Sequence, residues 1–307
     1  MDVSILSEKQ LPSFLDYCRK HKYEQDDSFL TEQDLDDFKI AYENPTWLLH
    51  EGEEIKGALS LICDDYYLKG QRARARIFHC ETGEENHYRS LLRAAVPLNY
   101  PIEKIEMFLP DGKSAARKII GNLGFSRYRT SYLMIRKDKN NTQPSFPQGY
   151  TLNQINLLSD ADLYREIRNR AFRNLKGSET PISRNDVIKH YNDKSLLEGG
   201  MAILRDGKRG VGILRVSREE EERGCFSFIG PLALIPEYQG RGLGRELLKA
   251  GIAIGREQGL ADCMLVVNGE NEMALRLYRG TGFEIDMSVS CYTYPNRALK
   301  NTPQPKR

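Results

Sequence analysis

A glycine turn between two apolar segments is the feature of this sequence best suited to chemistry. Gly240, Gly242 and Gly244 follow the apolar run 226–235, and apolar residues at helical spacing follow them over 243–254. The expected order is therefore strand, turn, helix. Such a turn directs backbone N–H groups to one point at the helix N-terminus, and glycine has no Cβ atom to keep an anion away. The pattern predicts a binding site for phosphate oxygens.

Two common phosphate-binding patterns do not match this turn. Arg241 and Arg245 add positive charge to it, but the Gly-Lys-Ser/Thr ending of a Walker A loop is absent. A dinucleotide-binding turn needs G-x-G-x-x-G and an acidic residue after the next strand. Here the spacing is G-x-G-x-G, and Asp262 comes before the next apolar run, 264–267. Both alternatives are excluded.

A second motif lies downstream of the turn. It reads Asn-x-x-Ala-x-x-x-Tyr and then Gly-Phe, from Asn271 through Tyr278 to Phe283. Combined with Gln-x-x-Gly-x-Gly, which begins at Gln239, it resembles the GCN5-related N-acetyltransferases (GNATs) over about residues 149–294. The resemblance implies an α+β fold, with a mixed and mostly antiparallel sheet flanked by helices. It also implies acetyl-CoA (coenzyme A) as the cofactor and acyl transfer to an amine.

The chain is long enough for two domains with their own cores. The segment 137–149 is polar, contains two prolines and lacks apolar periodicity, as is typical of a linker. We therefore expect two tandem GNAT-like domains, a degenerate one at 1–136 and a catalytic one at 150–300. Residues 301–307 are expected to be a disordered tail.

The end of the first half mirrors the second motif. Aligning the two Gly-Phe pairs matches Lys113 with Asn271, Ala116 with Ala274, Ile120 with Tyr278 and Gly124 with Gly282. The glycine turn itself has no counterpart, because Gly83 is followed by Glu84 and Glu85, whose charges would repel a pyrophosphate. Isoleucine at position 120 cannot donate a proton. The first half is therefore interpreted as a copy without a catalytic or cofactor site.

The resemblance assigns roles to residues of the second half. Tyr278 matches the family tyrosine that protonates the departing sulfur, and a phenol with a pKa of ~10 keeps its proton at neutral pH. Asn271 matches a residue that contacts the pantetheine arm, and it also suits a helix N-cap. A backbone N–H of the strand before the turn polarises the thioester; Pro231 has none, so Leu234 or a neighbour is expected. The residues expected to bind the cofactor are Leu232, Ala233, Leu234, Gln239, Gly240, Arg241, Gly242, Leu243, Gly244, Arg245, Asn271 and Tyr278.

The general base is where the sequence departs from the commonest family pattern. Many members carry a glutamate on the strand before the turn, but the run 226–234 contains no carboxylate. Glu221 is the candidate taken here, with its neighbours, Glu198 and a water relay as alternatives. The acceptor pocket is expected to involve Tyr164, Arg168 and Asn268.

Composition gives no case for nucleic acid or membrane as a partner. The formal net charge is +2, and charged residues of both signs are plentiful. No apolar run reaches transmembrane length, no signal segment begins the chain, and the six cysteines are scattered. These features predict a cytoplasmic protein with reduced thiols. The histidines lack ligand spacing, so no metal site is predicted.

Three local patterns complete the expectations. Residues 32–42 are predicted to form an amphipathic helix, and the charge run 219–222 a solvated loop. Arg72, Arg74 and Arg76 alternate along one strand face, which is interpreted as solvated; the alternative is a basic surface for an acidic substrate or for the other domain.

The sequence thus predicts an N-acetyltransferase that moves an acetyl group from acetyl-CoA to a primary amine of a small molecule or peptide. Two alternatives remain: a non-catalytic acyl-CoA-binding sensor or regulatory module, and an acyltransferase acting on a protein amine. Release of free coenzyme A with turnover distinguishes an enzyme from a sensor.

Overall fold

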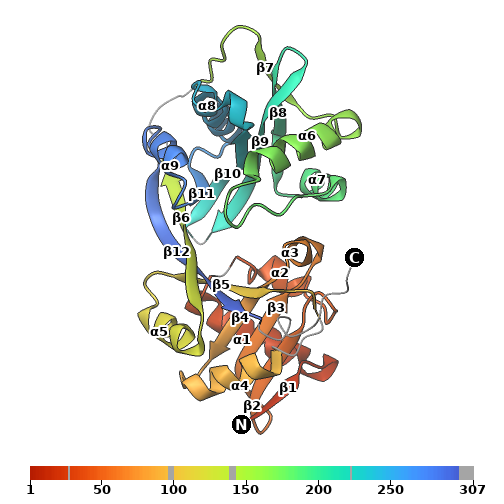
Figure 1. Cartoon of the computed structure of the whole chain (residues 1–307), viewed down its shortest axis with the longest axis vertical. Coiled ribbons are helices and arrows are strands. Elements are labelled where there is room, and N and C mark those ends of the chain that lie inside the picture. Colours follow the sequence, from red (N-terminus) through yellow and green to blue (C-terminus); the bar gives the residue numbers. More distant parts are fainter. Residues whose placement is uncertain (27, 96–99, 138–142, 222, 297–307) are drawn as a thin grey trace, which may run out of the picture. The chain divides into compact units, whose positions relative to one another are not determined.

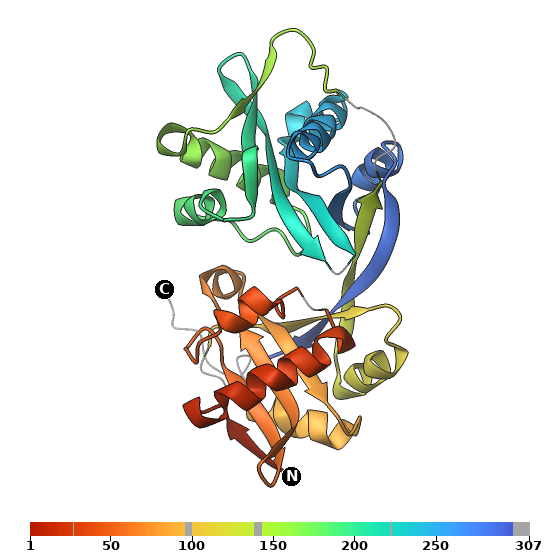
Figure 2. The same ribbon diagram turned by 180° about the vertical axis from the view of Figure 1, so that it is seen from behind.

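The computed structural model describes residues 1–26, 28–95, 100–137, 143–221 and 223–296. The chain divides into two compact units (Figures 1 and 2). The first unit comprises Met1–Thr130 and Ser288–Arg307, and the second comprises Ser131–Met287. Both units have a mixed, mostly antiparallel sheet flanked by helices, which confirms the predicted fold class.

The first unit is built around six strands in the order β1-β2-β3-β4-β5-β12. Its elements in chain order are β1 (Asp2–Ile5), α1 (Leu11–His21), α2 (Glu32–Asp36), β2 (Thr46–Glu51), β3 (Glu54–Ile62), α3 (Asp65–Lys69), β4 (Arg72–Cys80), α4 (Glu85–Ala95), β5 (Lys104–Pro110) and α5 (Ser114–Leu123). Short 3₁₀ turns flank α1 at Glu8–Gln10 and Lys22–Glu24. Among the described strand pairs of this unit, β4 and β5 are the parallel one.

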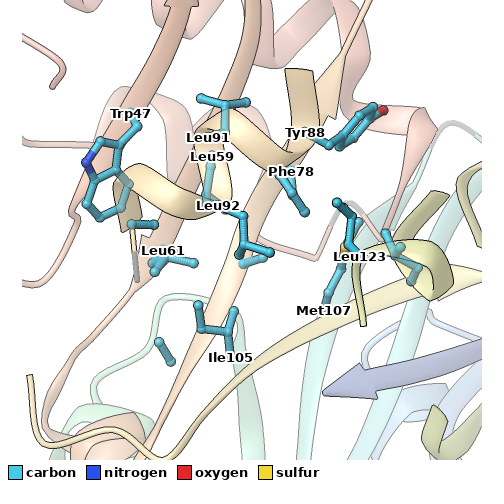
Figure 3. Packing of buried hydrophobic residues seen from close by; sticks show 14 of the residues in the cluster. Trp47, Leu59, Leu61, Phe78, Tyr88, Leu91, Leu92, Ile105, Met107 and Leu123 are labelled. Carbon is cyan, nitrogen blue, oxygen red and sulfur yellow. The ribbon is translucent and has the colours of Figure 1, made fainter. Parts of the chain in front are cut away.

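Two hydrophobic clusters hold this unit together, one on each face of its sheet. The larger joins α4 and α5 to the strands and includes Trp47, Phe78 and Leu91 (Figure 3). The smaller places Phe14 of α1 against Ile77 of β4. Because neighbouring residues of a strand point to opposite faces, Ile77 and Phe78 belong to different clusters.

The second unit has the strand order β6-β11-β10-β9-β8-β7. Its elements are β6 (Ser126–Arg136), β7 (Tyr150–Gln154), α6 (Leu157–Phe172), α7 (Arg184–Tyr191), β8 (Leu196–Asp206), β9 (Arg209–Glu221), β10 (Gly224–Leu234), a 3₁₀ turn (Pro236–Tyr238), α8 (Leu243–Glu257), β11 (Cys263–Asn268), α9 (Glu272–Arg279) and β12 (Glu284–Pro295). α6 and α8 cover opposite faces: Leu214 of β9 meets α8 at Gly251, and its neighbour Arg215 lies beside Tyr164 of α6.

The units exchange strands, so their limits differ from the predicted domains. Residues 131–136 of β6 pair with β11 in the second unit, although they belong to the predicted first domain. Residues 289–295 of β12 pair with β5 in the first unit, although they belong to the predicted second domain. Strand pairing depends on contacts between distant residues, so a polar segment does not mark the limit of a sheet. Residues 138–142 of the expected linker and the expected tail lie outside the described residues.

The internal repeat has the same backbone geometry in both units. Lys113 and Asn271 precede α5 and α9 with φ/ψ of −86°/65° and −86°/72°. Gly124 and Gly282 follow these helices with φ of 100° and 90°, a left-handed conformation that favours glycine. The aligned residues therefore begin and end α5 and α9 in the same way.

Two local expectations about secondary structure were wrong. α2 ends at Asp36, well short of residue 42. The charge run 219–221 is not a loop but the end of β9, because it pairs with residues 224–226 of β10.

The arginine face of β4 is covered instead of solvated. Arg72 is 4% exposed and pairs with the buried Glu106 at 3.0 Å, and Arg74 pairs with Asp26. The Arg74 guanidinium also lies 4.2 Å from the ring centre of Phe108. Aromatic rings and carboxylates from other parts of the chain thus cover charges that strand periodicity placed outside.

Candidate active site

The parallel strands β10 and β11 separate partway along their length. Their pairing covers Ser227–Cys263 and Phe228–Met264, whereas β10 continues to Leu234 and β11 to Asn268. β10 is also irregular between Ile229 and Leu232, at the cis peptide before Pro231. Within the described residues, the later part of β10 therefore has a strand partner on its β9 side only. The opening between the strands leaves a backbone edge for a ligand chain to pair with.

The glycine turn follows directly after this opening. Gly240 and Gly242 have φ of 74° and 80°, and a Cβ atom added to either would meet nothing within 4 Å. Gly242 is the N-cap of α8. The backbone N–H groups of residues 240–244 donate to no group in the described part of the chain. This cradle of free donors at the N-terminus of a 15-residue helix suits a diphosphate in geometry and charge.

Side chains of the turn fix it in place. Gln239 donates from Nε2 to the carbonyl of Leu234 at 3.0 Å, which ties the turn to the end of β10. Tyr238 donates to Asp206 at 2.9 Å, and the Arg241 guanidinium lies 4.8 Å from its ring centre. Arg241 and Arg245 are exposed at the turn. Gln239 thus supports the turn from within, whereas the two arginines face solvent beside the free N–H groups.

Helix α9 packs against the start of α8 and brings Tyr278 to the site. A Cβ atom at Gly244 would lie 3.6 Å from Leu277, and one at Gly280 would lie 3.8 Å from Arg245. Tyr278 itself is 8% exposed, and burial raises its pKa to about 12. Its hydroxyl has no hydrogen-bond partner within the described chain, so the buried phenol is a protonated donor that is available to a ligand.

Comparison with known proteins agrees with this geometry. Residues 162–283, which contain the opening, the turn and α9, match the model of the acetyltransferase (GNAT) family. The chain contains a GNAT domain. The crystal structure of a GCN5-related N-acetyltransferase from Sphaerobacter thermophilus superposes with a TM-score of 0.67 at 14% identity, covering 96% of each chain. A tandem GNAT protein from the clavulanic acid biosynthesis pathway gives 0.68 at 15% identity, covering 99% of this chain and all of that one. The tandem GNAT fold is thereby confirmed.

Curated proteins similar to this chain include mycothiol acetyltransferases. That of Actinosynnema mirum is 26% identical over 63% of this chain, and that of Thermobispora bispora is 28% identical over 55%. These matches cover 64% and 58% of the relatives' own lengths. Among the described residues, no helix has the length and apolarity needed to cross a membrane.

Three polar side chains of the GNAT domain hold helix ends and loops in place. Asn271 accepts from the N–H of Ala274 at 3.1 Å and so caps α9, as its sequence position suggested. Asn268 ends β11 and donates from Nδ2 to the carbonyl of Lys176 at 3.2 Å. Arg168 of α6 donates to the carbonyl of Thr180 at 2.6 Å. Asn268 and Arg168 therefore anchor the segment between α6 and α7.

A buried polar cluster on the α6 face contains an arginine that sequence analysis did not select. Arg215 of β9 is 9% exposed, pairs with Asp193 at 2.6 Å and donates to Ser217 at 3.1 Å. Tyr164 lies beside Arg215 and is fully buried. Its hydroxyl has no hydrogen-bond partner in the described chain. Burial raises the pKa of Tyr164, so this hydroxyl also stays protonated. The signal available in the sequence was a lone arginine inside an apolar strand, 211–216.

Glu221 is not brought to the other predicted residues. Glu221 pairs with Gly224 at the start of β10. Gly224 lies eight residues before Leu232, which corresponds to about 26 Å along the strand. The Glu221 carboxylate pairs with Arg223 at 2.8 Å, and Arg223 also binds Asp286. The β9–β10 hairpin thus holds Glu221 at the opposite end of β10 from the glycine turn, which argues against its role as the base.

Proposed function

We propose that the GNAT domain transfers an acetyl group from acetyl-CoA to a primary amine of a small molecule or peptide. The observation that carries the proposal is the set of free N–H groups at residues 240–244, packed against the helix that bears Tyr278. The relatives' name, mycothiol acetyltransferase, supports a small molecule as the acceptor.

Each residue of the site has a defined task in this proposal. The turn and the exposed Arg241 and Arg245 would hold the pyrophosphate of coenzyme A, whose thioester supplies the activated acetyl group. A free N–H of β10 near Leu234 would polarise the thioester oxygen. Tyr278 would give its phenolic proton to the sulfur, and its raised pKa keeps that proton in place at neutral pH.

The acceptor would lie on the α6 face of the opening. Tyr164 offers an unpartnered hydroxyl there, and Arg168 and Asn268 hold the adjoining segment between α6 and α7 in position. We therefore assign Arg168 and Asn268 to shaping the acceptor pocket, together with Tyr164, which is fully buried and supports the pocket from within the protein.

The test is release of free coenzyme A from acetyl-CoA in the presence of a library of amines. Amine-dependent release, with the product acetylated on nitrogen, supports the proposal. The second candidate, an acyl-CoA sensor, is favoured by the lack of a carboxylate on β10. It predicts stoichiometric binding of acetyl-CoA without release by any amine, including those of added proteins. A panel of acyl-CoA donors defines the acyl group.

A further inference from the structure

The first unit contains a cavity that the proposed function does not use. Its volume is ≈ 480 Å³, within the range of small-molecule sites. It lies where β4 and β5, like β10 and β11, stop pairing: their register ends at Arg74–Glu106, while the strands continue to Cys80 and Pro110. All of its lining residues belong to the first unit.

The cavity is lined by residues from both faces of the sheet. Phe78 and His79 are neighbours on β4 and therefore point to opposite faces, yet both line it. On one face the lining is apolar, and it includes Tyr88 of α4 and Met107 of β5, with Phe78 near both in Figure 3. Helix α5 continues this wall with Ala116, Ile119 and Ile120.

On the other face the lining is polar and centres on two stacked histidines. The rings of His79 and His21 are 4.3 Å apart. His79 Nδ1 lies 2.8 Å from the Tyr17 hydroxyl. Burial raises the pKa of Tyr17, so the hydroxyl keeps its proton, and we assign it as the donor of this bond. Burial, aided by His21, lowers the pKa of His79 to about 4. The neutral ring then carries its proton on Nε2, which has no partner within the described chain.

The charges at this end favour an anion over a cation. Glu81 already accepts from Lys20 at 2.6 Å, from His21 at 3.1 Å and from Lys56 at 3.4 Å. Glu24 is paired with Lys113 at 3.3 Å. Both carboxylates are thus neutralised by three lysines in total, and among the described side chains at this end the His79 Nε2–H group remains without a partner.

The chain itself closes the path that a pantetheine arm would take. The Gln25 side chain accepts from the N–H of Phe78 at 2.9 Å and donates to the carbonyl of Arg76 at 3.3 Å. The N–H of Asp26 donates to the carbonyl of Phe108 at 3.2 Å. Residues 25–26 therefore use the backbone groups of β4 and β5 that an extended ligand would pair with, and Glu84 and Glu85 disfavour a pyrophosphate at the start of α4.

We propose that this cavity binds a small amphipathic monocarboxylate, with its apolar body between Tyr88, Met107 and α5 and its carboxylate on the His79 Nε2–H group beside Lys20. The site is separate from the acetyl-transfer site and does not rest on the function proposed for it.

Calorimetric titration of octanoate into the full chain tests the proposal, with octylamine as the matched cation of equal chain length. We expect one saturable octanoate site and at least tenfold weaker binding of octylamine. Ala116→Trp fills the apolar end and should weaken octanoate at least tenfold. Lys118→Trp adds the same side chain at an exposed position of α5 that does not line the cavity, and should leave the affinity unchanged.

His79→Phe keeps a ring but removes the donor, so it should also weaken octanoate about tenfold; it serves as the second variant should Ala116→Trp melt early by circular dichroism. Absent or non-saturable octanoate binding, equal binding of octylamine, or equal effects of the two tryptophan variants would overturn the proposal. Displacement of octanoate by coenzyme A in a Gly242→Glu background would also overturn it, because the cavity would then be a nucleotide site.

Discussion

Gly242 separates the effect of a substitution on cofactor binding from its effect on folding. Its φ of 80° costs any other residue about 1–2 kcal/mol, but a Cβ atom there meets nothing within 4 Å, so no clash adds to this cost. Gly242→Glu should therefore lower the free energy of unfolding by about 1–2 kcal/mol and leave the domain folded.

The same substitution places a negative charge beside the expected pyrophosphate. Two unit charges ~5 Å apart repel by about 1 kcal/mol in water and about 3 kcal/mol at an effective dielectric constant of 20. Per ligand charge, this corresponds to roughly 5- to 200-fold weaker binding, and a pyrophosphate carries more than one charge. We expect acetyl-CoA binding to fall below detection in a calorimetric titration.

Gly207→Glu is the matched control. Gly207 also has a positive φ, of 55°, and open space around its missing Cβ atom, but it lies in the β8–β9 turn. This variant should lose similar stability and keep wild-type affinity for acetyl-CoA. Wild-type affinity in Gly242→Glu would refute the glycine-turn site, and equal loss in both variants would show that the effect comes from stability alone.

Three further perturbations test the site and its scaffold. Tyr278→Phe should lower kcat at least tenfold with little change in KM, and an unchanged kcat would remove Tyr278 as the acid. Wild-type activity should show no alkaline loss from this group up to pH ~10, because its raised pKa of about 12 keeps the phenol protonated. Glu81→Gln should lower Tm at neutral pH: hydrogen bonds from Lys20 lower the pKa of Glu81 to about 2, so its contribution is present above pH ~4.5 and lost as pH falls towards 2. A Tm difference that persists near pH 2 would contradict this. Gly255→Ala should destabilise the protein by about 1–3 kcal/mol, because its Cβ atom would lie 2.5 Å from Ser227. Gly121→Ala, on a helix with open space around it, should stabilise the protein by about 0.5–1 kcal/mol. Chemical denaturation that ranks the two variants the other way would refute the packing argument.

The geometry of the glycine turn and of the helix that carries Tyr278 was predictable because its signals are local. Glycines are needed wherever φ is positive or a backbone must be approached closely, and Gly240 and Gly242 show the first of these requirements. Asn271 caps the helix that carries Tyr278, as predicted. This cap was predictable because a capping residue and its helix are adjacent in the sequence. The acceptor half depends on distant contacts. Arg168 and Asn268 were selected for a pocket, yet they hold a loop whose path their own positions in the sequence do not define.

Charge patterns in this chain were the least informative signal. The arginines of β4 look solvated in sequence, but Glu106 and Asp26 lie against Arg72 and Arg74 from positions 34 and 48 residues away. Glu221 was chosen as the candidate base from just upstream of the strand before the turn, and the register of the β9–β10 hairpin places it at the end of that strand farthest from the turn. The position of a charged residue in the sequence does not show which side chains will lie against it, because those side chains come from distant parts of the chain.

The sequence by itself determined the strand–turn–helix cradle, the tyrosine helix and the repeat between the two halves, because each depends on residues that are close along the chain. Only the tertiary structure decided that the two units exchange β6 and β12, that Gln25 and Asp26 close the first unit's opening to an extended ligand, and that a cavity remains beneath them. These features arise from hydrogen bonds between residues tens to hundreds of positions apart, and no local pattern encodes which distant strand or side chain will supply them.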